Sequence, residues 1–505
     1  MNDKTNHNAL ALLDDGLLKE KRGEAEAARH LFKQVSEKNP NLYVELYKEA
    51  EKLRDNQLNQ QALDILHKVG KILPQDPIPH HMVAILYQDL GNKDLAEVFL
   101  KKSLAITPTP ESYSQLAALY EKSNQLNDAW ATSNLGLRMF PGDPYLTLTL
   151  ARVERRAKKF GPALERLLAI AGTTGDPILE GQIGFQLGWL YDQADKIDEA
   201  FAQYVSAKKI AAGNAAPDGG DKNVAFEYIE AMKALDLKAL PNVPYKPGKD
   251  EPAGVAFLVG FPRSGTTLLN QILDAHPDIV SMEEAPTLPG PAEFIDNLPG
   301  GYPKALPDLD EKTIRQMREV YFQRVQNYCD FSKDSIVIDK LPLNLVHLPL
   351  IWTLFPEAKI ILALRHPLGA ALSNFMHNFK LNNAMANMFS LEDITKYYAA
   401  VMGLWQHFRG AKDFAFHAIK YEDVVTNIQT EAEKICKFLE VDWSPEMLEY
   451  SKHARAKGLI NTPSYHQVTR PLYSEALERW RRYEKHLAPH QKGLEPFCKY
   501  FGYTL

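Results

Sequence analysis

Residues 255–269, with the sequence VAFLVGFPRSGTTLL, are the part of the chain whose residue types and spacing best suit chemistry. The apolar run predicts a buried strand at 256–261, and the residues after it predict a tight loop and then a helix. Such a turn directs several backbone N–H groups and a helix N-terminus at one point, which suits phosphate or sulfate. A nucleotide-hydrolysing P-loop carries a lysine where this chain has Thr266, and the cation here comes earlier, at Arg263. The sequence therefore predicts an oxyanion site that lacks the lysine contacting a γ-phosphate.

Three further predicted strands, at 335–339, 359–364 and 414–420, also lead into polar residues. The residues at or just beyond their carboxyl ends are Asp339, Lys340, Arg365 and Tyr421. Helical patterns lie between the strands, which predicts a doubly wound parallel sheet with its ligands at the carboxyl ends of the strands. The run IVIDK also resembles a Walker-B strand, as in a kinase or nucleotidase, but the missing loop lysine argues against that interpretation.

The composition is typical of a globular protein with two or three domains. The 505 residues are 45% hydrophobic and 24% charged, and the formal net charge of −6 gives no support to nucleic-acid binding. The three cysteines lie far apart and favour a reducing compartment. Because we find no secretory signal, no apolar run of membrane-spanning length and no set of metal ligands, we expect a cytoplasmic protein without a membrane span or a metal.

Small residues recur in the first half about every 34 residues, the period of the tetratricopeptide repeat. The recurring residues are Ala28, Ala62, Ala96, Ala129, Ala163 and Ala200. A second small residue comes about twelve positions before each, from Gly16 to Gly188, and together they would let two antiparallel helices cross closely. The pattern predicts a solenoid of about six units over residues 9–212. We expect its groove to bind a peptide or partner protein, and it is also compatible with self-association into a homodimer.

The repeat pattern ends before a segment rich in glycine and proline, which predicts a linker over residues 213–252 with one capping helix. The predicted α/β domain then occupies residues 253–505. The fold class is therefore α plus α/β: an all-helical solenoid followed by a P-loop-like domain with a parallel sheet.

Two segments of the second half, FPRSGTTLLNQILDAHP and LRHPLGAALSNF, resemble the cofactor-binding segments of sulfotransferases. The closest resemblance is to tyrosylprotein sulfotransferases, and it covers roughly residues 253–500. The repeats ahead of it are similar to those of bacterial repeat-containing sulfotransferases. The resemblance implies 3′-phosphoadenosine 5′-phosphosulfate as the sulfuryl donor, adenosine 3′,5′-bisphosphate as the product, and no requirement for metal.

The same resemblance implies roles in donor binding. The residues matching the 5′-phosphosulfate loop are Arg263, Ser264, Gly265, Thr266 and Thr267. Arg365 and Ser373 match the pair that holds the 3′-phosphate, and Tyr421 matches a tyrosine that contacts adenine. Arg470 and Arg479 fall in the closing segment of the family and would lie over the cofactor.

Catalytic roles follow from the resemblance as well. Glu284 matches the general base that takes a proton from the acceptor hydroxyl, although the adjacent Glu283 is an alternative base. Lys340 and Ser464 match residues that stabilise charge on the bridging oxygen, with Arg263 also at the reacting group.

The acceptor site departs from the family pattern. The tyrosylprotein enzymes follow the catalytic glutamate with arginines that bind acidic peptides, and this chain has Pro286 and Gly290 there. A protein tyrosine is our first expectation for the hydroxyl-bearing acceptor, with a carbohydrate, lipid or small molecule as alternatives. An alternative of another class is a repeat scaffold whose second domain binds a nucleotide without turnover.

Overall fold

The computed structural model describes all residues except 1, 40, 56–58, 215–219, 250 and 457–476. Within them the chain forms two compact units, which divide between Leu167 and Leu168. The predicted limits of the repeat region, linker and second domain remain predictions. In the described part of the chain, none of the helices has both the length and the apolar character needed to cross a bilayer.

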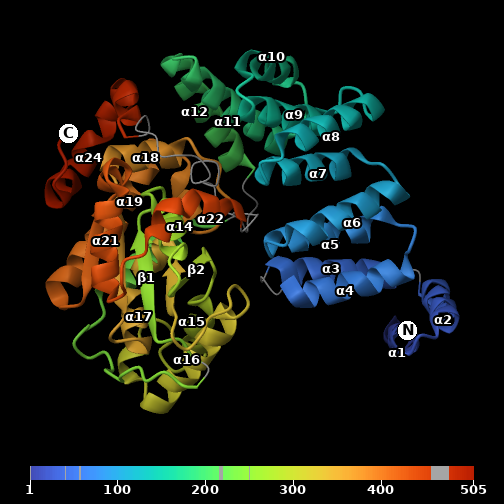
Figure 1. Ribbon diagram of the computed structural model, residues 1–505, viewed down its shortest axis with the longest axis horizontal. Coiled ribbons are helices and arrows are strands. Elements are labelled where there is room, and N and C mark those ends of the chain that lie inside the picture. The colour runs from blue at the N-terminus through green and yellow to red at the C-terminus, as the bar shows by residue number, and fades with distance from the viewer. Residues whose placement is uncertain (1, 40, 56–58, 215–219, 250, 457–476) are drawn as a thin grey trace. The chain divides into compact units, whose positions relative to one another are not determined.

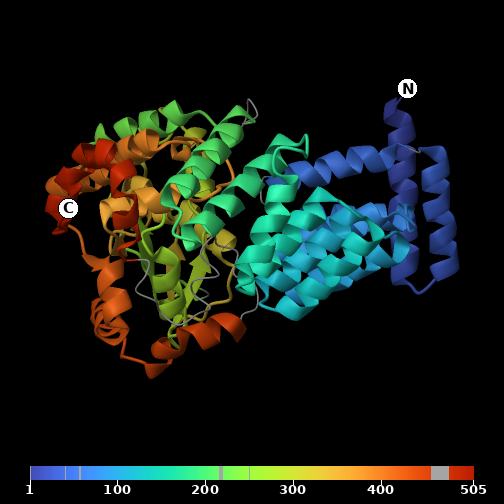
Figure 2. The ribbon, with the colours of Figure 1, turned by 90° about the horizontal axis from the view of Figure 1, so that it is seen from above.

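The first unit is built from consecutive helix pairs (Figures 1 and 2). Its helices are α1 (Asn2–Lys21), α2 (Ala25–Lys38), α3 (Leu42–Asp55), α4 (Asn59–Ile72), α5 (Pro77–Asp89), α6 (Lys93–Ile106), α7 (Pro110–Lys122), α8 (Leu126–Met139), α9 (Pro144–Arg156) and most of α10 (Phe160–Ile170). Thr109 and Asp143 cap α7 and α9 through their side chains, and a proline follows each cap. Each of these two helices therefore starts with a capping side chain and then a proline, at a position where the helix uses no backbone N–H.

The small residues of the repeat lie at close helix crossings, as predicted. All six recurring alanines are at most 1% exposed. A Cβ added to Gly16 would come within 2.6 Å of the Phe32 ring, so only glycine fits there without a shift. The same holds in the second unit, where a Cβ on Gly188 would lie 2.9 Å from Tyr204.

The second unit opens with α11 (Pro177–Gln193), α12 (Ile197–Gly213) and α13 (Lys222–Lys233) and continues into a five-stranded parallel sheet. The strands are β1 (Gly254–Gly260), β2 (Ile279–Glu283), β3 (Ile336–Lys340), β4 (Lys359–Leu364) and β5 (Phe416–Lys420). Their order is β2-β3-β1-β4-β5. The chain crosses from one side of β1 to the other between β3 and β4, and such a switch point is where parallel sheets bind ligands.

Helices enclose this sheet, and strands β1 and β2 lie at the centre of the unit in Figure 1. The helices that follow the strands are α14 (Thr266–Asp274), α15 (Pro289–Asp296), α16 (Glu311–Val325), α17 (Leu348–Leu354), α18 (Pro367–Phe375), α19 (Leu391–Ala411), α20 (Tyr421–Thr426), α21 (Ile428–Leu439), α22 (Tyr450–Ala456) and α24 (Glu484–Phe501). Every residue of β1 after Gly254 is buried, as expected for a central strand covered on both faces.

The predicted fold class is confirmed: a helical N-terminal region precedes a parallel α/β domain. The four strands predicted from the sequence are all present, with small shifts at their ends. Strand β2 was not predicted, and it forms the edge of the sheet beside β3.

Candidate functional site

The loop between β1 and α14 is held in a conformation that depends on two glycines. Gly260 has φ 156°, and a Cβ there would lie 2.5 Å from the carbonyl oxygen of Ala363 on the neighbouring strand. Gly265 has φ 90° and caps α14 without a side-chain hydrogen bond. Ser264, Thr266 and Thr267 around it are buried. The first-turn N–H groups of α14 are therefore presented at the mouth of the loop, as an anion site requires.

Arg263 sits at the tip of this loop in a left-handed backbone conformation, with φ 68°. A non-glycine residue in this region is uncommon, so the loop must be held by other contacts. The Arg263 Nε donates to Ser373 Oγ at 3.3 Å, and the Arg263 carbonyl accepts from Arg365 Nη1 at 3.2 Å. Asn374 Nδ2 donates to the carbonyl of Pro262 at 2.8 Å. Helix α18 and Arg365, two residues before it, therefore hold the loop in place.

Tyr421, the residue directly after β5, contacts the same loop. A Cβ on Gly265 would lie 2.6 Å from the Tyr421 ring, so the glycine allows this ring to approach the loop. The Arg365 guanidinium lies over the ring, 4.9 Å from its centroid. The structure thus brings together five of the predicted donor residues from three separate segments. These residues are Arg263, Gly265, Arg365, Ser373 and Tyr421.

The predicted base and its partner lie side by side at the carboxyl ends of β2 and β3. Lys340 Nζ donates to Glu284 Oε1 at 3.0 Å, and the Glu284 N–H donates to the Lys340 carbonyl at 2.8 Å. The Lys340 side chain is 0% exposed, whereas that of Glu284 is 37% exposed. The carboxylate can therefore meet an acceptor from solvent while the ammonium stays buried. Glu283 is instead hydrogen-bonded by Gln271 Nε2.

Asp339, next to Lys340, is a buried carboxyl group with protein partners. Tyr321 and Thr287 donate to its Oδ2 and Asn344 donates to its Oδ1. Burial raises the pKa of Asp339 to about 6, opposed by these hydrogen bonds and by Lys340. Because protein donors already bind both oxygens, this carboxylate is poorly suited to the Walker-B role considered above.

Two of the predicted residues, Ser464 and Arg470, lie outside the described residues. Arg479 is described, and its Nε and Nη2 donate to the buried carboxylate of Asp192 on α11 at 3.3 and 2.7 Å. The next residue, Trp480, stacks on His366 with ring centroids 4.2 Å apart, directly beside Arg365 in sequence. Arg479 therefore lies on a segment that packs against the start of α18.

Sequence reasoning missed several residues that build this site. Asn374 directly follows the predicted residue Ser373 on the same helical turn, and this position could have identified it from the sequence. Asp192 on α11 and Lys208 on α12 lay in the predicted solenoid, and nothing in the repeat pattern linked them to the donor loop. Lys208 Nζ donates to the backbone carbonyls of His377 and Asn374 at 2.7 and 3.4 Å.

Comparison with known protein families gives a match over the residues of this site. The model of the sulfotransferase family matches residues 256–445, which include the loop, Glu284, Lys340, α18 and Tyr421. The match to the sulfotransferase family therefore covers the segment that carries the donor loop and the Glu284–Lys340 pair.

Relatives of known sequence extend this result. The chain is similar to human "Protein-tyrosine sulfotransferase 1", with 28% identity over 257 residues, or 49% of this chain and 67% of that protein. It is also similar to an uncharacterized protein of Aquifex aeolicus, with 26% identity over 319 residues. That match covers 61% of this chain but only 40% of the Aquifex protein. A solved sulfotransferase domain from the curacin biosynthetic pathway is 18% identical, with a TM-score of 0.36, and covers 52% of this chain and all of that domain.

Proposed function

We propose that this protein transfers the sulfuryl group of 3′-phosphoadenosine 5′-phosphosulfate to an acceptor hydroxyl and leaves adenosine 3′,5′-bisphosphate. The observation that carries the proposal is the linked group of Arg263, Ser373 and Arg365 around the Gly265 loop. Two guanidinium groups and an uncapped helix N-terminus there match a ligand with anionic groups at two places. The family match over the same residues supports the choice of donor.

The residues fit this donor by their chemistry. Arg263, Gly265 and the two threonines that follow would hold the 5′-phosphosulfate, and Arg365 with Ser373 would hold the 3′-phosphate. The Tyr421 ring would contact the adenine base. The donor, once bound, supplies the activated sulfuryl group.

The transfer itself needs a proton acceptor and a stabilising cation. In the proposed mechanism, the Glu284 carboxylate takes the proton of the acceptor hydroxyl as its oxygen forms a bond to sulfur. The bond from sulfur to the bridging phosphate oxygen breaks, and the Lys340 ammonium stabilises the charge left on that oxygen. The hydrogen bond from Lys340 also fixes the Glu284 carboxylate in place before reaction. Ser464 would stabilise charge on the same oxygen together with Lys340, and Arg470 and Arg479 would lie over the donor.

For the acceptor, we propose a protein tyrosine. The names of the relatives and the repeat region, which would recruit the acceptor or a partner, support this choice. The acceptor side also differs from the family: a Cβ on Gly290 would meet the Arg324 side chain of α16, and Arg324 donates to the carbonyl of Pro286 at 3.3 Å. An arginine from another element thus occupies this region.

Transfer of labelled sulfate from the donor to tyrosine peptides and to glycans tests the activity and the acceptor together. We expect labelled peptide, and a product found only with glycans would overturn the tyrosine assignment. Glu284→Gln should lower kcat at least 100-fold and leave the affinity for the bisphosphate within twofold. Glu283→Gln is the matched control, and if it alone abolishes transfer the base is Glu283.

Thermal unfolding distinguishes the enzyme from a nucleotide-binding scaffold and from a kinase-like domain. Adenosine 3′,5′-bisphosphate at ~100 times its Kd should stabilise the protein by about 2.7 kcal/mol, whereas ATP with magnesium should not. Arg365→Ala should weaken the bisphosphate far more than adenosine 5′-phosphosulfate. Stabilisation by ATP with magnesium alone would refute the proposed donor, and donor binding without any turnover would favour the scaffold.

A further inference from the structure

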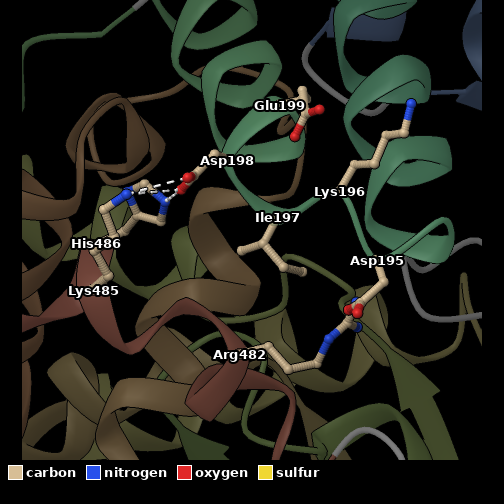
Figure 3. Close-up of a pocket in the computed structure, with 8 residues that line it drawn as sticks. All are labelled: Asp195, Lys196, Ile197, Asp198, Glu199, Arg482, Lys485 and His486. Carbon is tan, nitrogen blue, oxygen red and sulfur yellow. Dashed lines mark hydrogen bonds and ion pairs between the residues drawn. The ribbon is translucent and has the colours of Figure 1, made fainter.

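The helix pair α11–α12 is the sixth in chain order, yet it belongs to the compact unit that holds the sheet. The turn between its helices meets the C-terminal segment at a cavity of about 440 Å³ (Figure 3). Asp198 pairs there with Lys485 and His486 at 3.1 and 2.7 Å. Asp195 pairs with Arg482 at 2.7 Å. Acidic side chains of the helix pair thus meet basic ones of the C-terminal segment, which fixes one end of α12.

A second attachment lies further along α12, at Lys208. Its side chain is 4% exposed, and the structure shows no carboxylate within ion-pair distance of it among the described residues. The ammonium instead donates to the carbonyls of Asn374 and His377, at the C-terminal end of α18. The negative end of the helix dipole lies there, and the carbonyls of the last turn can accept a further hydrogen bond, so a cation is favoured.

Burying the Lys208 ammonium costs free energy that an apolar residue at this position would not cost. Burial lowers its pKa to about 7, and the rings of Phe185 and Phe379 lie 5.5 and 5.6 Å from the ammonium. An apolar residue of similar length would fill this space without that cost. The contacts that Lys208 makes at α18 are therefore what distinguishes it from such a residue.

The last turn of α18 is the part of the helix that holds the donor loop. Ser373 accepts from Arg263, and the side chain of Asn374 donates to Pro262. Lys208 binds the main chain of the same Asn374. Two successive contacts therefore run from Lys208 through Asn374 to Pro262 of the loop, and the contact between Ser373 and Arg263 lies beside them.

We propose that Lys208 of the helix pair α11–α12 is a positioning residue for the donor loop, acting through the last turn of α18. The proposal rests on the proposed function, because it assigns to the loop the adenosine bisphosphate moiety of the donor. The helix pair α11–α12 would then support the donor loop in addition to any role in the repeat array.

Calorimetric titration of the full chain with adenosine 3′,5′-bisphosphate tests this inference. Lys208→Met should raise the Kd about tenfold, because the turn that holds Arg263 and Pro262 loses its support. The matched control is Lys209→Met, on the same helix but exposed, which should stay within twofold. In turnover, the KM for the donor should rise in Lys208→Met while kcat changes by less than threefold.

A double-mutant cycle separates positioning from a general effect on folding. In an Asn374→Ala background the tether to Pro262 is already gone, so Lys208→Met should add less than a twofold change in Kd. An unchanged Kd in Lys208→Met, or a full tenfold effect that persists in the Asn374→Ala background, would overturn the inference.

Hydrogen exchange of the unmodified protein gives an independent test if the variants fold poorly. The bisphosphate should slow exchange of the α12 amides around residues 205–211 as well as those of the loop, because coupling between two sites is reciprocal. Protection of the loop without any change in α12 would refute the role of Lys208. A wild-type protein that does not bind the bisphosphate would instead refute the proposed function itself.

Discussion

Removing either partner of the Lys340–Glu284 pair should have unequal effects on stability. The Lys340 side chain is 0% exposed and that of Glu284 is 37% exposed, with 3.0 Å between Nζ and Oε1. Glu284→Gln leaves a buried ammonium without its counter-charge, which costs about 3–5 kcal/mol in a fully buried pair. Because water reaches Glu284, we reduce this to about 2 kcal/mol. Lys340→Met removes the buried charge and leaves a carboxylate that water can solvate, so its cost should be below ~1 kcal/mol.

Urea unfolding without ligand measures these values. In a Trp130→Phe background all remaining tryptophans, Trp352 and Trp405 among them, lie in the second unit, so their fluorescence reports that unit. This matters because the two units need not unfold together. In the Lys340→Met background, Glu284→Gln should cost less than ~0.5 kcal/mol, since no buried ammonium remains to be left unpaired. If Lys340→Met is the more destabilising single change, or if the two effects simply add, the burial argument is wrong.

Three further outcomes can be measured on the same unit. Gly265→Ala should destabilise by about 2 kcal/mol and abolish bisphosphate binding, because φ is 90° and the new Cβ meets the Tyr421 ring at 2.6 Å; unaltered binding would contradict the loop geometry. The pKa of Lys208 is about 7 in the folded protein and 10.5 for a free side chain, so above pH 7 the unfolded chain binds more protons. The free energy of unfolding of the wild type should therefore rise between pH 7 and 9 relative to that of Lys208→Met, by up to ~1.4 kcal/mol per pH unit. Parallel pH curves of the two proteins would contradict this. Burial lowers the pKa of His347 to about 4 from 6.5, so the wild type should lose stability as pH falls from 6.5 towards 4, and His347→Gln should lose less over that range.

The sequence predicts the loop and the strands around it well because their signals are local. The loop needs glycine where the backbone turns to positive φ, and strands buried on both faces are read as apolar runs. Once the strands are parallel, the residues at their carboxyl ends must share one edge of the sheet, which is why Arg263, Arg365 and Tyr421 meet. Strand β2 escaped prediction because its five residues, IVSME, include two polar ones. A short edge strand gives a weak pattern.

Contacts between residues far apart in sequence could not be predicted in this way. Asp192 and Arg479 are 287 positions apart, and each has an ordinary local context for a helix surface. Only the fold shows that Asp192 is buried and that it binds Arg479, Arg482 and the Tyr483 hydroxyl. The resemblance predicts Arg479 as a cation over the donor, which stays a prediction, and the structure shows its guanidinium bound to the Asp192 carboxylate.

Helix α12 illustrates why a repeat pattern does not predict such contacts. The period fixes only the inner positions, where Ala200 is fully buried and Tyr204 lies against Gly188. The pattern places no demand on the neighbouring positions, and in α12 these include Phe201, which stacks on His486 with centroids 4.0 Å apart, and Lys208. One helix can thus carry the residues of the repeat and, beside them, residues that contact α18 and the C-terminal segment. Residues beside the repeat positions of α12 are therefore where its contacts with the parallel-sheet part of the same unit should be sought.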